Sequence, residues 1–354
     1  MSSGGRGIAA RWSRRLCVVG GLLAPLAWGG APSSQAPENT RPPSLPRLET
    51  QCTQGDAKAC SFLGMLHGQG NGVAKDTKRA IALFEQACQG GLASGCYNAG
   101  VSYEQGLGIP ADAKRAAALY EKSCQGGDAS GCNALGVLLK QGRGVSRDDK
   151  RAASLFKKLC DEGESLGCNS LGVSYKEGRG VPKDDKRAAA LFEQACTGGT
   201  GLGCYNLGGF HQQGRGVPKD DTRAASFFEK ACERGDAPGC FRLGELFAAG
   251  RGVPQDDGRA ASLFGRACTS GEAAGCYDLA LFHAKGRGVP QNDQRAASLA
   301  QQACDGGLAV GCMALAGLHA QGRGVPQDAK RAAALYERAC AGGVTQACQA
   351  PGKR

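Results

Sequence analysis

The stretch that decides the fold is residues 160–196, CDEGESLGCNSLGVSYKEGRGVPKDDKRAAALFEQAC, which begins and ends with a cysteine and has a third, Cys168, eight residues after the first. The same pattern returns every 36 residues along most of the 354-residue chain. A fixed period of this length is typical of a solenoid, in which each supersecondary unit contacts only its neighbours. The sequence therefore predicts a repeat array and not a single globular core.

Eighteen of the nineteen cysteines follow this period in two series. The first series is Cys52, Cys88, Cys124, Cys160, Cys196, Cys232, Cys268, Cys304 and Cys340. The second lies eight residues further on, at Cys60, Cys96, Cys132, Cys168, Cys204, Cys240, Cys276, Cys312 and Cys348. Pairing across 28 residues would leave Cys52 and Cys348 unpaired, whereas pairing across eight leaves none of the series unpaired. We therefore expect nine disulfides, because metal and redox centres favour the closer Cys-x2-Cys spacing.

Two short helices are expected in each repeat. In residues 127–163, Asp128 can cap a first helix that runs to about Gln141, and Asp148 can cap a second. Apolar or small residues recur on both at the i, i+3, i+4, i+7 spacing of one helical face. Gly163 supplies a left-handed C-cap. The predicted fold is an all-α, α/α solenoid superhelix of eight 36-residue helix-pair repeats over residues 48–350, with one disulfide per repeat and a tail at 351–354.

The N-terminal segment is predicted to be an export signal, residues 1–31. A basic stretch without acidic residues ends at Arg15, and an apolar run to Trp28 follows that is short for a membrane span. An uncleaved membrane anchor and a mitochondrial presequence are the alternatives. Residues 32–47 contain five prolines and are expected to form an extended linker. The prediction is a secreted or periplasmic protein, or one of the mitochondrial intermembrane space in a eukaryote, with no stable membrane span after cleavage.

The repeat resembles a known family. The elements LG at 171–172, GRGVP at 178–182 and RAAALFE at 187–193 are similar to the Sel-1-like repeat, a relative of the tetratricopeptide repeat. With two cysteines per unit, the chain resembles the Helicobacter cysteine-rich proteins. The resemblance implies an adaptor that binds a peptide or protein. It also implies, as an alternative, a beta-lactamase-like hydrolase or penicillin-binding protein, because a fold alone does not fix function.

The position directly after the second cysteine of each pair is the predicted partner-binding position. By similarity to tetratricopeptide repeats it faces a concave groove, and in four repeats it is aromatic: Tyr97, Tyr205, Phe241 and Tyr277. Asn133 and Asn169 stand at the same position, and a second variable position four residues further on includes Glu245 and Leu281. Rings and amides of this kind suit peptide binding. The alternative is that these are ordinary exposed helix residues.

Histidines and arginines that recur at fixed positions of the repeat are expected to have structural roles. The four histidines, His67, His211, His283 and His319, share a position that is Tyr, Leu or Phe in the other repeats, so we expect packed side chains and no metal site. A metal site or catalytic base is the alternative. The arginine that recurs three residues after an acidic or Asn cap is expected to support that cap, with a polyanion-binding ladder as the alternative. Loop arginines are expected to be solvated turn residues: Arg143, Arg179, Arg215, Arg251, Arg287 and Arg323.

No catalytic residue and no cofactor is assigned. Serine beta-lactamases use a nucleophilic serine followed three residues later by a lysine, and only Ser154 with Lys157 has this spacing here. The Ser-Asp-Asn and Lys-Thr-Gly elements that complete such a site are absent from the sequence. The formal net charge is +11, but no basic cluster with interleaved aromatic residues appears, so nucleic acid is not an expected partner. A purely structural envelope protein is a third class. The sequence sets no oligomeric state.

Overall fold

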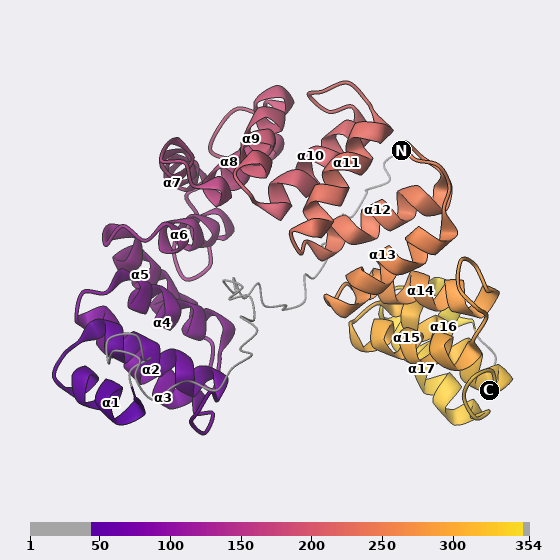
Figure 1. The fold of residues 1–354 in the computed structure, drawn as a ribbon, viewed down its shortest axis with the longest axis horizontal. Coiled ribbons are helices and arrows are strands. Elements are labelled where there is room, and N and C mark those ends of the chain that lie inside the picture. Colours follow the sequence, from indigo (N-terminus) through magenta and orange to yellow (C-terminus); the bar gives the residue numbers. More distant parts are fainter. Residues whose placement is uncertain (1–43, 350–354) are drawn as a thin grey trace, which may run out of the picture. The chain divides into compact units, whose positions relative to one another are not determined.

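The computed structural model describes residues 44–349, so the predicted leader and most of the linker lie outside the described residues. Within that range the chain is all helical and has no strand, as predicted, and Figure 1 shows the helices in chain order. The helices are α1 Leu45–Thr53, α2 Ala57–Gln69, α3 Thr77–Gln89, α4 Ala93–Gln105, α5 Ala113–Gln125, α6 Ala129–Gln141, α7 Asp149–Asp161, α8 Ser165–Glu177, α9 Asp185–Thr197, α10 Gly201–Gln213, α11 Asp221–Glu233, α12 Ala237–Ala249, α13 Asp257–Thr269, α14 Ala273–Lys285, α15 Asp293–Asp305, α16 Ala309–Gln321, α17 Ala329–Ala341 and α18 Thr345–Cys348.

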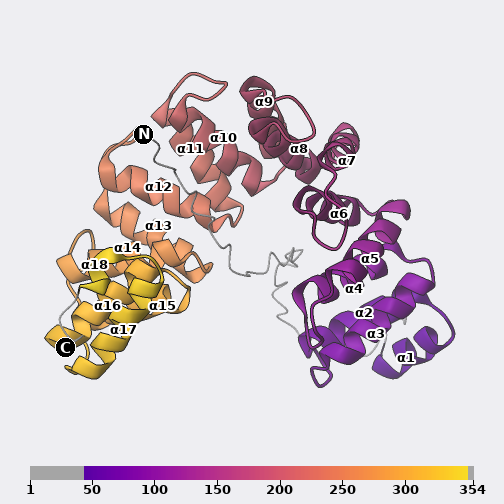
Figure 2. The same cartoon turned by 180° about the vertical axis from the view of Figure 1, so that it is seen from behind.

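Each repeat is a pair of helices, an even-numbered first helix and an odd-numbered second helix, beginning with α2 and α3. Every helix packs against the next one in the chain, and Figures 1 and 2 show this succession from two sides. The first helices of neighbouring repeats also pack against each other, for example α10 against α12. We call the side of the stack on which the even-numbered helices lie the first-helix face.

Side-chain caps and left-handed glycines stand at many of the helix ends. The Asp184 carboxylate accepts a hydrogen bond from the Arg187 amide at 2.9 Å and caps α9, while the Arg187 guanidinium lies 3.3 Å from the same carboxylate. The first helix before it ends at Gly178, whose φ of +69° is a left-handed conformation that glycine adopts without strain. The sequence-predicted helix boundaries therefore rest on observed caps.

In the first six repeats the core is an aromatic ring of the second helix against a glycine of the first. A Cβ atom on Gly172 would lie 2.7 Å from Cε1 of the fully buried Phe192, so the ring occupies the space that a side chain would take. The same contact joins Gly64 to Phe84, Gly100 to Tyr120, Gly136 to Phe156, Gly208 to Phe228 and Gly244 to Phe264. In the seventh repeat both positions are alanine, Ala280 and Ala300, and both are buried. The seventh repeat thus has a larger side chain on the first helix and a smaller one on the second, whereas the eighth combines Ala316 with the partly exposed Tyr336.

Disulfides connect neighbouring repeats. The sulfur atoms of all nine pairs that are eight residues apart lie at bonding distance, between 1.93 and 2.07 Å. In each case the bond joins the last turn of one helix to the first turns of the next, as in Cys196 of α9 and Cys204 of α10. Most of these cysteines are buried, so the bonds belong to the packed stack.

The start of the array differs from the prediction. Residues up to 47 were expected to be extended linker, but α1 begins at Leu45. Pro46 stands in the first turn, where a missing backbone N–H costs no helical hydrogen bond. Leu48 of this helix is buried against α2, so α1 covers the first repeat. Among the described residues, no helix combines the length and apolar character needed to cross a membrane.

The loop arginines are partly exposed, as expected of solvated turn residues, but they are also ion-paired, which the sequence did not predict. Five of them pair with the aspartate that begins the second helix of the preceding repeat; Arg215 lies 2.7 Å from Asp185, and Arg179 lies 3.0 Å from Asp149. Arg143 pairs with Glu104 at 3.1 Å, because the equivalent aspartate position is Ala113. The loop crosses directly over that helix terminus, and this proximity between residues about 30 apart is invisible to a search for local charge pairs.

A candidate partner-binding recess on the first-helix face

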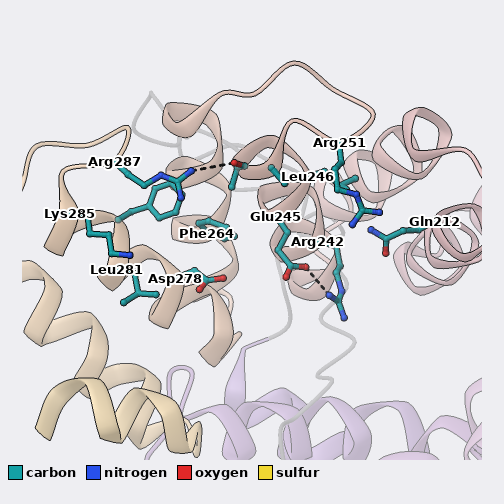
Figure 3. A pocket seen from close by; sticks show the side chains of 13 residues that line it. Gln212, Arg242, Glu245, Leu246, Arg251, Phe264, Asp278, Leu281, Lys285 and Arg287 are labelled. Atoms are coloured by element: carbon teal, nitrogen blue, oxygen red, sulfur yellow. Dashed lines mark hydrogen bonds and ion pairs between the residues drawn. The ribbon is translucent and has the colours of Figure 1, made fainter. Parts of the chain in front are cut away.

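A recess of about 530 Å³ opens between α10, α12 and α14. Figure 3 shows its side chains, which come from three successive first helices, from Phe264 of the second helix α13 and from the loops that follow α12 and α14. Its walls combine charged and apolar groups: Gln212, Arg242, Glu245, Leu246, Ala248, Ala249, Arg251, Phe264, Asp278, Leu281, Phe282, Lys285 and Arg287. Two of these, Glu245 and Leu281, occupy the second variable position identified in the sequence.

Most of the charges in the recess are already paired. Arg242 lies 2.8 Å from the Glu245 carboxylate on the same helix. The guanidinium groups of Arg251 and Arg287 form ion pairs with Asp221 and Asp257, the aspartates that begin the second helices of the preceding repeats. Arg287 also lies over the Phe282 ring, 4.6 Å from its centroid. These contacts hold three of the four cations in fixed positions.

Asp278 is the exception. Its half-buried side chain has no hydrogen bond or ion pair with any residue in the described part of the chain. Burial, and secondly the negative charge of Glu245, raise the pKa of Asp278 to about 6. A carboxylate that is desolvated without a partner weakens the fold at neutral pH, and such groups are concentrated at functional sites.

Replacing Asp278 by asparagine is therefore expected to stabilise the protein at pH 7.5. The carboxyl group binds its proton more tightly in the folded than in the unfolded chain, so stability falls as pH rises from about 4 to about 6. After allowance for the partial exposure of the side chain, we expect Asp278→Asn to gain about 1 kcal/mol at pH 7.5 and almost nothing at pH 4. Urea unfolding at the two pH values measures this, and an equal effect at both would contradict it.

The predicted aromatic residues are half-buried and take part in the packing of the stack. The ring of Tyr205 lies 5.8 Å from that of Phe228, and the ring of Phe241 lies 5.8 Å from that of Phe264. Tyr97 contacts Tyr120 in the same way, and Tyr277 packs beside the Cys268–Cys276 disulfide. Replacing them by alanine would thus change stability as well as any surface they present, so they are poor probes of binding.

Polar side chains at the neighbouring position connect successive first helices. Ser170 donates a hydrogen bond to the Asn133 amide oxygen at 2.7 Å, and Asn206 donates to Asn169 at 2.9 Å. Arg242 and Asp278 occupy the corresponding places in the next two repeats. The sequence analysis missed this position, because it attended to the aromatic residues directly before it. The sequence did contain a signal for this position, because its residue type varies between repeats whereas most positions of the repeat are regular.

The histidines are packed side chains in three of the four cases. His211, His283 and His319 are buried, and the Nδ1 atom of each lies 3.3 Å from the carbonyl oxygen of a loop proline. Both ring nitrogens of His67 are buried without a hydrogen-bond partner among the described residues. Within residues 44–349 no group of three or more His, Cys, Asp or Glu residues is arranged to hold a metal ion.

Ser154 and Lys157, the pair with the spacing of a serine beta-lactamase, lack the lowered lysine pKa that this chemistry requires. Ser154 is exposed on α7, and the Lys157 ammonium lies 2.6 Å from the Asp161 carboxylate. That hydrogen bond raises the pKa of Lys157, whereas a lysine that acts as a general base needs a lowered one. This pair therefore offers no base to activate the serine.

Comparison with known proteins identifies the repeat. The Sel1 repeat model matches eight successive segments: residues 57–92, 93–128, 129–164, 165–200, 201–236, 237–272, 273–308 and 309–344. A Sel1 repeat protein from Oxalobacter formigenes is 26% identical with a TM-score of 0.61, and the match covers 86% of this chain and 89% of that one. No curated protein matches the sequence.

Two further solved structures are similar over parts of their length. The protective antigen c5321 of uropathogenic Escherichia coli is 28% identical with a TM-score of 0.59; the match covers 86% of this chain and 66% of that one, just under two thirds of its length. Helicobacter pylori cysteine rich protein B is 34% identical over 37% of this chain and 93% of its own, with a TM-score of 0.31. With eight consecutive matches over residues 57–344, the chain belongs to the Sel1 repeat family.

Proposed function

We propose that this protein is an exported scaffold that holds a peptide or protein partner on its first-helix face, in the recess between α10, α12 and α14. The observation that carries the proposal is a recess of about 530 Å³ that combines an apolar wall with an unpaired charge. Repeat scaffolds of this kind commonly mediate protein interactions, and three successive repeats contribute to one surface here. Extended segments are recognised by such combinations of apolar contact and placed polar groups.

The proposed compartment follows from the disulfides. Nine of them in one chain indicate an oxidising environment, because the thiols of cytosolic proteins are kept reduced. An extracellular or periplasmic location fits this requirement and the predicted leader at residues 1–31. The hydrolase alternative has no comparable support, since the one serine–lysine pair of the right spacing is the ion-paired Lys157 described above.

Selection of a displayed random peptide library against the oxidised protein tests the proposal. We expect enriched peptides to lose about five- to tenfold in affinity for Leu281→Gln, because this change removes apolar contact at the recess without adding charge. Leu166→Gln is the matched control: Leu166 is an exposed leucine of α8 outside the recess, and this variant should bind normally. Fluorescence anisotropy of a labelled peptide gives the affinities. Failure to enrich any peptide, or equal binding by both variants, would contradict the proposal.

A further inference from the structure

We infer that the recess selects a cationic side chain, a lysine or arginine of the bound segment, and places it against Asp278. This inference rests on the proposed function and adds the chemistry of the partner. Of the charged side chains that line the recess, Arg242, Arg251 and Arg287 each contact a carboxylate, and Glu245 is held by Arg242. Asp278 and Lys285 are the two lining residues of the described chain whose charge has no such partner.

The two unpaired groups are not equivalent. Lys285 is exposed at the end of α14 and is hydrated in the free protein, so it gains little from a partner. Asp278 is half-buried and desolvated, and Figure 3 shows it on the side of the recess that faces Glu245. A ligand that supplies a positive charge here gives this carboxylate an ion-pair partner that the described residues do not provide. An anionic ligand would meet Asp278 and Glu245 together.

The apolar wall suits the stem of such a side chain. Leu281 lies between Asp278 and Lys285 along α14, and Leu246 and Phe282 add further apolar surface. Lysine and arginine place their methylene groups on apolar surface while the charged end reaches a polar partner. The neighbouring helix α16 contains no aspartate or glutamate, so no acid from that helix competes for the cation. The arrangement is specific to this repeat, because the equivalents of Asp278 on the helices to either side are Arg242 and Ala314.

The charge of the whole protein makes the expected preference informative. The chain has a formal net charge of +11, which repels a basic peptide at long range. Binding of a cationic probe would therefore report a local site and not general attraction. We would measure fluorescence anisotropy with three labelled peptides in which alanine alternates with lysine, glutamine or glutamate, using the full oxidised protein at low ionic strength.

We expect the lysine peptide to bind about tenfold more tightly than the glutamine peptide at pH 7.5, and the glutamate peptide more weakly still. Asp278→Asn should remove most of this preference. Glu233→Gln is the control with the same change of charge, at an exposed residue at the end of α11 outside the recess, and it should keep the preference. Lowering the pH through about 6 should weaken lysine-peptide binding to the parent protein, because Asp278 then becomes protonated, and should leave Asp278→Asn unchanged.

Several results would overturn the inference. They are equal binding of the three peptides, a preference for glutamate, no binding of the lysine peptide, or a lysine preference that survives in Asp278→Asn. A preference for glutamate that is lost in Lys285→Gln would assign the site to an acidic segment. Each of these outcomes leaves the proposed function intact. Peptides selected from a library can still lose affinity for Leu281→Gln even if the charge of the peptide has no effect on binding. The two tests therefore fail independently.

Discussion

Reduction of the nine disulfides is expected to remove most of the helicity of the solenoid at temperatures where the oxidised protein is fully folded. Each bond closes a loop of about nine residues, for which chain entropy gives about 2–3 kcal/mol, and the contributions do not add fully. In a stack where each repeat contacts only its neighbours, these bonds act at every interface between repeats. Far-UV circular dichroism during heating, with and without reductant, measures the effect.

Two single-disulfide variants separate loop entropy from packing. Replacing Cys196 and Cys204 by alanine removes a fully buried bond at the middle of the array, whereas replacing Cys340 and Cys348 removes a partly exposed bond at its end. Because both loops have the same length, the entropy terms are equal, and we expect the central variant to lower the melting temperature more. A reduced protein that melts within a few degrees of the oxidised one would contradict this role for the disulfides.

The sequence was sufficient to predict features that depend on contacts within one repeat. The 36-residue period, the Asp184-type caps and the glycines that end each helix are local, so their physical causes lie within a few residues of each other. The start of α1 was missed because five prolines were weighed together, although Pro46 stands in the one turn that tolerates it. Composition over a window cannot identify such a position.

Features that depend on contacts between repeats were predicted less well. The pairing of Arg215 with Asp185 crosses 30 residues and follows from how one loop lies on the preceding repeat. The recess depends on which side chains three first helices present to one another, and Asp278 is exceptional only because no neighbour offers it a partner. A regular register predicts where a side chain stands, whereas its partner depends on the geometry of the stack.

The second large expected effect is on stability, and it comes from the contact between Gly172 of α8 and the Phe192 ring of α9. Phe192→Ala is expected to cost about 3–5 kcal/mol, because it empties the space of a fully buried ring. Gly172→Ala alone should cost about 1–3 kcal/mol, since the new methyl group would lie 2.7 Å from the Phe192 ring, and this outweighs the better helix propensity of alanine.

Together, the two substitutions should cost clearly less than the sum of their separate effects. The double variant recreates the combination of the seventh repeat, Ala280 with Ala300, in which a methyl group on the first helix replaces part of the missing ring. We expect a coupling free energy of at least about 1 kcal/mol from denaturant unfolding of the four oxidised proteins. Additivity within about 0.5 kcal/mol would show that the ring and the glycine are independent. Coupling would instead mean that helix separation is set pair by pair, since a second helix can approach the first only as far as the side chain at this one position allows.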